Sequence, residues 1–267
     1  KADEAMAVVR SGPGAVPDPS VRPAELNGKV LQRADLVAAE SVRLPAGRPD
    51  RTYRVALGGG EAGYIAVRPD NPNIVFAGEY QGYMTRYDHG TGQARNISVW
   101  PEEYSGSGAN AFKYRFQWTY PIIISPHDPN TVYCGGNHVF RSTDEGSSWE
   151  AVSPDLTWND PKTHEPSGGP ITKDNTGAEV YGTVFTIAES PKKKGVIWAG
   201  SDDGRLHMSK NGARSWEEVT PTDLPERALM SIVEASPHDP AVAYLAANRY
   251  KHDDFRPYLY VTRDYGA

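Results

Sequence analysis

The sequence predicts an all-β fold, a β-propeller made of four-stranded antiparallel blades, on three observations. First, the 267 residues include 26 Gly, 22 Pro, 15 Tyr and 6 Trp, a composition that favours short strands and frequent turns. Second, one strand, turn and strand pattern recurs along the chain. Third, the copies are spaced by roughly 40 to 60 residues, as propeller blades are. About four blades are expected, and we expect them to belong to a larger propeller because most propellers carry more.

The first two strands of each unit flank a polar turn that begins with proline. The four prolines are Pro69, Pro126, Pro191 and Pro237. A short apolar strand precedes each turn and a β-branched or aromatic strand follows it, as in IISPHDPNTVYCGG from Ile123. Two of the turns contain histidine, His127 and His238, but they belong to different blades and therefore predict no shared metal site.

A third strand with alternating apolar residues follows in every unit, for example RLHMSKN from Arg205. A tight polar loop and a fourth strand complete the first three units, whereas the fourth unit is truncated. The predicted blades cover residues 51–105, 112–158, 178–222 and 228–267. Residues 1–50 lack the repeat, and we expect a partly irregular N-terminal extension or linker there.

Charge and cysteine content exclude several classes of partner and cofactor. The net charge is −6, and the one dense basic run is Lys192 to Lys194, so nucleic acid is not an expected partner. The single cysteine, Cys134, permits neither an internal disulfide nor a cysteine metal site. No apolar run reaches the roughly 20 residues of a membrane helix. The sequence therefore predicts a soluble protein without a membrane span, a metal or another cofactor.

A turn motif follows the third strand of the later units. Ser142 to Trp149 fits the pattern Ser/Thr-x-Asp-x-Gly-x-x-Trp, and Ser209 to Trp216 fits it with Asn for Asp and Ala for Gly. In such a turn a short Asx side chain bonds backbone N–H groups, glycine adopts a positive φ, and the indole packs under the hairpin. The motif thus indicates a structural fastener. Its predicted members are Ser142, Asp144, Gly146, Trp149, Ser209, Asn211, Trp216 and Asp264.

These motifs resemble those of the BNR or Asp-box propellers, which include sialidases, sortilin-type receptors and several glycoside hydrolases. The segments SPHDPNTVYCGGNHVFRSTDEGSSWEAVSPDLT and YDHGTGQARNISVWP look more closely like large bacterial sortilin-like or glycosyl-hydrolase-like BNR repeat proteins. The resemblance covers roughly residues 55–267. It implies that the Asp-box turns lie at the blade periphery, away from the ligand cavity, and that the protein is secreted or periplasmic.

Four residues near the predicted inner strands are candidates for catalysis. Glu179 and Tyr181 are two residues apart, so they share one face of a strand, and a carboxylate beside a phenol can act as base and nucleophile. A hydrogen bond between blades is the alternative role for this pair. Asp202 lies in an Asp-Gly-type hairpin turn, and its alternative role is to pair with Glu61 or Glu179 as general acid and base.

Four further residues are candidates for ligand binding. The run FKYRFQWTY from Phe112 combines aromatic rings with two cations, and exposed rings of this kind stack on sugars while Arg forks onto hydroxyls or carboxylates. Arg115, Trp118 and Tyr120 come from this run, and Arg227 precedes the first strand of the last blade. A sialidase would also need an arginine triad, for which only Arg115 and Arg227 are well placed.

The sequence leaves three functions open because propellers serve enzymes and receptors alike. The first is a binding module of an exported bacterial protein that holds a peptide or glycan in its channel, as the resemblance implies. The second is a glycoside hydrolase with paired channel carboxylates, so whether the protein is an enzyme stays open. The third is a structural subunit, in which other blades or subunits cover the terminal blades.

Overall fold

The structure, a computed structural model, describes residues 25–26, 29–30, 42–43, 52–53, 63–168 and 180–267. The chain divides into two compact units, residues 1–57 and 58–267. In the smaller unit β1 (Glu25–Leu26) pairs with β2 (Lys29–Val30), and β3 (Val42–Arg43) pairs with β4 (Thr52–Tyr53), both antiparallel. The rest of the predicted extension, residues 1–50, lies outside the described residues.

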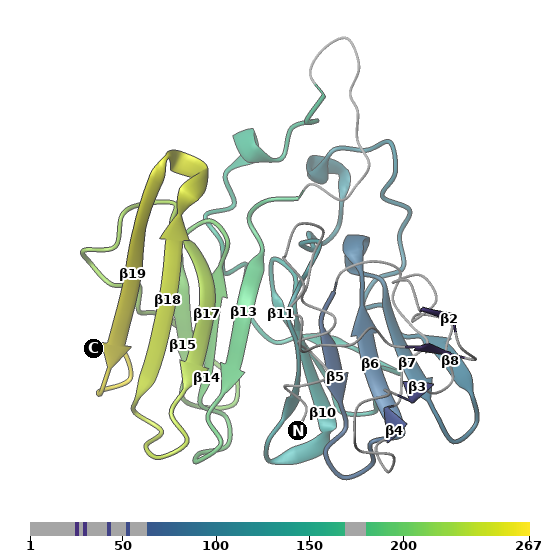
Figure 1. The fold of residues 1–267 in the computed structure, drawn as a ribbon. Helices are drawn as coiled ribbons and strands as arrows, with labels where there is room; N and C mark the ends of the chain where they lie inside the picture. Colours follow the sequence, from purple (N-terminus) through teal and green to yellow (C-terminus); the bar gives the residue numbers. More distant parts are fainter. Residues whose placement is uncertain (1–24, 27–28, 31–41, 44–51, 54–62, 169–179) are drawn as a thin grey trace. The chain divides into compact units, whose positions relative to one another are not determined.

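Four antiparallel sheets follow one another in the described part of the larger unit, which confirms the predicted all-β fold of propeller blades (Figure 1). The first sheet contains β5 (Ile65–Val67), β6 (Ile74–Gly78), β7 (Met84–Asp88) and β8 (Gln93–Asn96). The second contains β9 (Ile122–Ser125), β10 (Asp128–Gly135), β11 (Val139–Ser142) and β12 (Glu150–Ala151). The third contains β13 (Val184–Glu189), β14 (Ile197–Ser201), β15 (Leu206–Ser209) and β16 (Glu217–Glu218). The fourth has three strands, β17 (Leu229–Ala235), β18 (Ala243–Arg249) and β19 (Asp254–Thr262).

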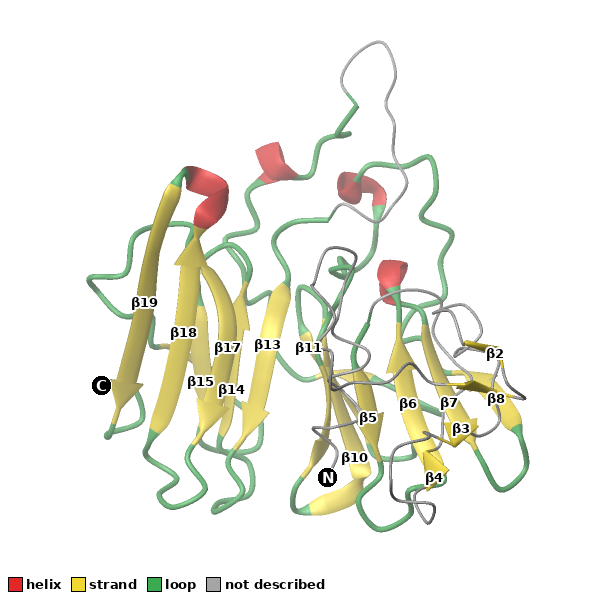
Figure 2. Ribbon diagram, in the orientation of Figure 1, coloured by secondary structure: helices red, strands yellow, loops and turns green. Residues whose placement is uncertain are grey.

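The strands of each sheet lie in the order in which they occur in the chain, so every blade is a simple meander. The first strands of successive sheets contact one another: β5 meets β9, β9 meets β13, and β13 meets β17. They therefore form the inner side of the blades. Four single-turn 3₁₀ helices, drawn red in Figure 2, interrupt the strands of the described chain. They are η1 (Tyr80–Gly82), η2 (Ala109–Ala111), η3 (Pro161–Thr163) and η4 (Tyr250–His252).

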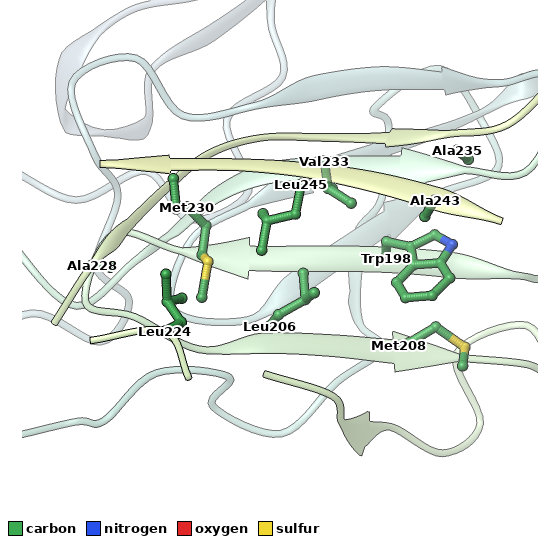
Figure 3. Packing of buried hydrophobic residues seen from close by; sticks show 11 residues of the cluster. Trp198, Leu206, Met208, Leu224, Ala228, Met230, Val233, Ala235, Ala243 and Leu245 are labelled. Atoms are coloured by element: carbon green, nitrogen blue, oxygen red, sulfur yellow. The ribbon is translucent and has the colours of Figure 1, made fainter. Parts of the chain in front are cut away.

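Apolar side chains fill the space between each pair of neighbouring sheets. The strict alternation of strand residues decides which interface a side chain joins. In β14, Ile197 and Ala199 pack toward the second sheet, whereas Trp198 between them packs toward the fourth sheet. Figure 3 shows Trp198 with Leu206, Met230 and Leu245 in the interface between the third and fourth sheets. The blades are thus held together by side chains that a single blade would leave in water.

The fourth sheet has one covered face and one open face. Leu245 points toward the third sheet and is buried, whereas Tyr244 beside it is half exposed. Tyr244 occupies the position that corresponds to the fully buried Trp198 of the preceding blade, because both pair with a residue of the third strand in the same register. Leu259 of β19, on the same open face, is 77% exposed.

The polar turns that follow the third strands repeat one hydrogen-bond pattern. In the second sheet Ser142 Oγ accepts bonds from the backbone N–H groups of Asp144 and Gly146, and Asp144 Oδ1 accepts one from Ser148 N at 2.9 Å. The third sheet repeats these bonds at the corresponding positions, with Ser209 and Asn211 as acceptors. The fourth sheet repeats the first two, with Thr262 Oγ1 as acceptor.

The indole of this turn also bonds to the neighbouring blade, a role that the sequence did not predict. Trp149 Nε1 donates to the carbonyl of Ile97, which follows the last strand of the first sheet, at 2.8 Å. Trp216 Nε1 donates in the same way to Val152, which follows the last strand of the second sheet, at 2.9 Å. The predicted fastener of one hairpin is therefore also a connection between two blades.

The turn of the third sheet holds an alanine in a left-handed backbone conformation, and this gives a first prediction. Ala213 has a φ of +68°, whereas the corresponding Gly146 and Gly266 have φ values of +82° and +88°. A left-handed backbone is unfavourable for alanine by about 1–2 kcal/mol, and part of this is returned by the buried methyl group. Ala213→Gly is expected to raise the free energy of unfolding by about 0.5–1 kcal/mol, measured by urea denaturation.

The reverse exchange is the matched control. Gly146→Ala is expected to lower the free energy of unfolding by about 2 kcal/mol, because it adds the same backbone cost and places a Cβ 2.8 Å from Cβ of Ile97. If both exchanges left the urea midpoint unchanged, the turn conformation would not limit stability.

Candidate functional site

A pocket of about 430 Å³ opens at one end of the third and fourth sheets. In an antiparallel sheet the start of one strand and the end of the next lie at the same edge. The starts of β13 and β17 and the ends of β14 and β18 therefore meet there. The third blade and the connection before it contribute Asp160, Thr163, Tyr181 and Asp202. The fourth blade contributes Arg227, Leu229, Asn248, Arg249, Lys251 and His252.

Asp202, a predicted catalytic residue, lines this pocket directly after β14. Its Oδ1 accepts hydrogen bonds from the backbone N–H groups of Gly182 and Thr183 at 2.9 and 2.8 Å, and its Oδ2 accepts one from Thr183 Oγ1. These donors favour the ionised carboxylate. Burial outweighs them, and with the neighbouring charge of Asp203 it raises the pKa of Asp202 to about 7. A carboxyl group of this kind can give and take a proton near neutral pH.

Asp160 is the second carboxylate of the pocket. Its Oδ1 accepts a bond from the backbone N–H of Lys162, which caps η3, and its Oδ2 lies 3.2 Å from Nη2 of Arg227. Sequence reasoning missed this residue. An Asp-Pro pair at the start of a short helix was visible in the sequence, but a cap of this kind is a common structural signal and indicates no site by itself.

Tyr181 and Arg227, both predicted site residues, meet at the pocket. Burial raises the pKa of the Tyr181 phenol to about 12, the charges of Asp203 and Asp202 add to this, and Arg227 opposes it. The phenol therefore stays protonated at neutral pH and can donate a hydrogen bond. Arg227 has a φ of +60°, which is rare for a residue with a side chain.

Trp158 lies beside the pocket, and sequence reasoning missed it as well. Its backbone N–H donates to Oδ2 of Asp203 at 2.9 Å, which fixes the connection after the second sheet to the β14–β15 hairpin. The guanidinium groups of Arg205 and Arg227 lie 4.3 and 5.2 Å from the centre of its ring. These cation–π contacts hold Arg227 against the mouth of the pocket.

The structure places Arg115, a predicted ligand-binding residue, in contacts within the protein. Its guanidinium is buried and bonds to three groups of the protein: the carbonyl of Gly182 at 3.1 Å, Asp155 Oδ2 at 2.8 Å and Thr157 Oγ1 at 3.1 Å. Arg115 is not among the pocket residues. It joins the second and third blades instead.

Trp118 and Tyr120, predicted ligand-binding residues of the same aromatic run, also lie outside the pocket. Tyr120 is 1% exposed, and its hydroxyl donates to the carbonyl of Tyr83 at 2.7 Å, so its ring offers no face to a sugar. Trp118 is partly exposed, with its ring 5.4 Å from that of Tyr80. Neither residue lines the pocket. Glu61 and Glu179, the other predicted catalytic residues, lie outside the described residues.

The predicted turn residues, from Ser142 to Asp264, lie at the opposite end of the sheets from the pocket. The turns follow the third strands at one edge, whereas η3 and η4, which carry pocket residues, lie at the other edge (Figure 2). Within the part of the chain that the structure describes, no group of three or more His, Cys, Asp or Glu could hold a metal ion. Among the same residues, no helix is long and apolar enough to cross a membrane.

Comparison with known proteins gives a distant glycoside hydrolase relative. No family model matches the chain. Over 175 residues the chain is 26% identical to the oligoxyloglucan-reducing end-specific xyloglucanase of Emericella nidulans, a match that covers 62% of this chain and 20% of that protein. The chain thus spans about a fifth of the length of this relative.

Two similar solved structures are GH74 proteins. The GH74 xyloglucanase of Xanthomonas campestris has a TM-score of 0.47 and 17% identity, with 74% of this chain and 28% of that chain covered. An ancestral GH74 enzyme has a TM-score of 0.48 and 16% identity, with 78% and 23% covered.

Proposed function

We propose that the chain is part of an exported β-propeller glycoside hydrolase and that its pocket holds the glycan. The observation that carries the proposal is the pair of carboxyl groups, Asp160 and Asp202, in one pocket. Glycoside hydrolases use two such groups, one as an acid and one as a base or nucleophile. The similarity to a xyloglucanase supports the same reaction class.

The roles follow from the surroundings of the two groups. Asp202, whose pKa burial raises to about 7, would protonate the glycosidic oxygen as the bond to the anomeric carbon breaks. Asp160, ion-paired with Arg227, would take a proton from the water that adds to the anomeric carbon. One water is consumed, and the two products are a free sugar end and a free hydroxyl. The Tyr181 phenol would donate a hydrogen bond to a sugar hydroxyl.

The repeated turns and the open face belong to the same proposal. We assign the turns at Ser142 and Ser209 to the Asp-box type, because the hydroxyl, the Asx side chain and the indole recur in the same order. The apolar face that carries Tyr244 and Leu259 would receive a further blade, because the corresponding face of the third sheet is covered in this way.

Hydrolysis by the 267-residue chain tests the proposal. Release of reducing ends from a panel of neutral and acidic polysaccharides is expected, and Asp202→Asn should lower kcat at least about 100-fold because it removes the acid. Asp160→Asn should have a similar effect. Glu150→Gln on the exposed part of β12 is the control and should retain full activity.

Two results would count against the proposal. Saccharide binding without turnover by the unmodified chain would favour the binding-module hypothesis instead. Turnover that persists in both the Asp202 and Asp160 variants would place the reaction outside this pocket.

A further inference from the structure

The pocket lining contains three permanent cations and two carboxyl groups. The chain has a net charge of −6. The cations are Arg227, Arg249 and Lys251, and the carboxyl groups are Asp160 and Asp202. Two of these cations are ion-paired, Arg227 with Asp160 and Arg249 with Asp254. The kind of ligand that the pocket favours therefore depends on which N–H groups of these arginines are left without an acceptor.

Two guanidinium groups of the pocket have N–H groups to spare. Nη1 of Arg227 and Nε of Arg249 are buried and find no hydrogen-bond partner in the described residues. The other contacts of these groups are made elsewhere on the same side chains. Nη2 of Arg227 bonds to Asp160 at 3.2 Å, and Nη1 of Arg249 lies 3.7 Å from Oδ2 of Asp254. A buried donor without an acceptor is costly, and a ligand oxygen would remove that cost.

The backbone holds Arg227 in place for such a contact. Its φ of +60° is unfavourable for a side-chain-bearing residue, and strain of this kind is common at ligand clamps. Gly204, with a φ of +107°, packs directly against it, since a Cβ on Gly204 would lie 2.9 Å from the backbone nitrogen of Arg227. The β14–β15 hairpin therefore fixes the backbone of Arg227, and the Trp158 ring fixes its guanidinium.

We propose that the sugar bound in this pocket carries a carboxylate, as a hexuronate does, and that Arg227 and Arg249 bind that carboxylate. The proposal rests on the proposed function only in using the same pocket. Arginine is suited to this contact because its planar N–H groups match a carboxylate, and the exposed Lys251 at the rim adds long-range attraction. An acidic glycan, rather than neutral xyloglucan, is thus the expected substrate class.

Calorimetric titration of the 267-residue chain tests this with three probes: a trigalacturonate, a neutral xyloglucan oligosaccharide and a sulfated oligosaccharide. The trigalacturonate is expected to bind at least ten-fold more tightly than the neutral probe and to weaken as salt is raised. Arg227→Gln and Arg249→Gln should each lower its affinity roughly ten-fold or more, while affinity for the neutral probe changes less than about two-fold.

Arg256→Gln is the matched control. Arg256 shares the partner Asp254 with Arg249, at 2.8 Å, but it is exposed and does not line the pocket, so its loss should leave the trigalacturonate affinity unchanged. Thermal unfolding of each variant verifies folding. If Arg227→Gln does not fold, Arg249→Gln and Lys251→Gln decide the question.

Several outcomes would overturn the proposal. Equal affinity for the neutral probe, tighter binding of the sulfated probe alone, or unchanged trigalacturonate affinity in the arginine variants would each do so. Hydrolysis of neutral glucans that depends on Asp202 but shows no charge preference would overturn it and leave the proposed function standing. Tight trigalacturonate binding without hydrolysis of any glycan would support binding of an acidic sugar and count against the proposed hydrolase function.

Discussion

Trp198→Ala is expected to lower the free energy of unfolding by about 3–5 kcal/mol. Trp198 is fully buried between the third and fourth sheets, and Met208 and Ala243 lie beside it (Figure 3). Alanine would leave a cavity that rigid neighbouring strands cannot fill, so both the burial of the ring and its packing contacts are lost. Urea denaturation followed by far-UV circular dichroism measures the change.

Trp198→Phe separates the ring from its polar group. The Nε1 donor of Trp198 is buried and lacks a hydrogen-bond partner among the described residues. Phenylalanine keeps an aromatic ring and removes that donor. The free energy of unfolding should therefore fall by no more than about 1.5 kcal/mol, because removal of the unpaired donor partly offsets the smaller side-chain volume. A phenylalanine variant as unstable as the alanine variant would mean that the indole donor is satisfied in solution.

The second large effect concerns pH and Asp202. Burial raises the pKa of Asp202 from its ordinary 3.8 to about 7 in the folded protein. Between these pH values the folded state keeps a proton that the unfolded state releases, so stability falls as pH rises through this window. Asp202 alone is expected to lower the free energy of unfolding by roughly 3 kcal/mol between pH 4 and pH 7, with little further change above pH 8.

The measured quantity is the difference in the free energy of unfolding between the original chain and Asp202→Asn. It is obtained by urea denaturation at several pH values from about 4.5 to about 8. The difference is needed because other groups titrate in the same range. Burial lowers the pKa of His164 and of His207, and these shifts make stability rise with pH. A pH dependence that is identical in the two proteins would show that Asp202 is ionised in the folded state throughout.

The strands were predictable because their pattern is local. Period-two alternation and proline-led turns are written within each repeat, and the strand order of a meander follows from them. The alternation in β14 also contains the information that Trp198 and Ile197 face different blades. What it does not contain is which blade each face meets, because that depends on how the sheets are stacked.

The pocket was only partly predictable because its members come from distant parts of the chain. Asp202 and Arg227 were candidates, since each lies next to a predicted strand. Asn248 and Arg249 were missed, although they end the second strand of their blade, close to the position that Asp202 has after the second strand of the preceding blade. Comparing the repeats position by position, rather than searching for polar clusters, would have found them. The burial of Tyr120 could not be predicted, because composition does not distinguish a packed ring from an exposed one.

The indole bonds of Trp149 and Trp216 each reach one blade back, to the residue after its last strand. Each of these bonds therefore joins only two neighbouring blades, and the later blade in the sequence always supplies the donor. Unfolding of one blade should first destabilise the blade whose indole bonds to it. Thermal unfolding is therefore expected to proceed blade by blade, and the cooperativity of the transition should depend on these contacts.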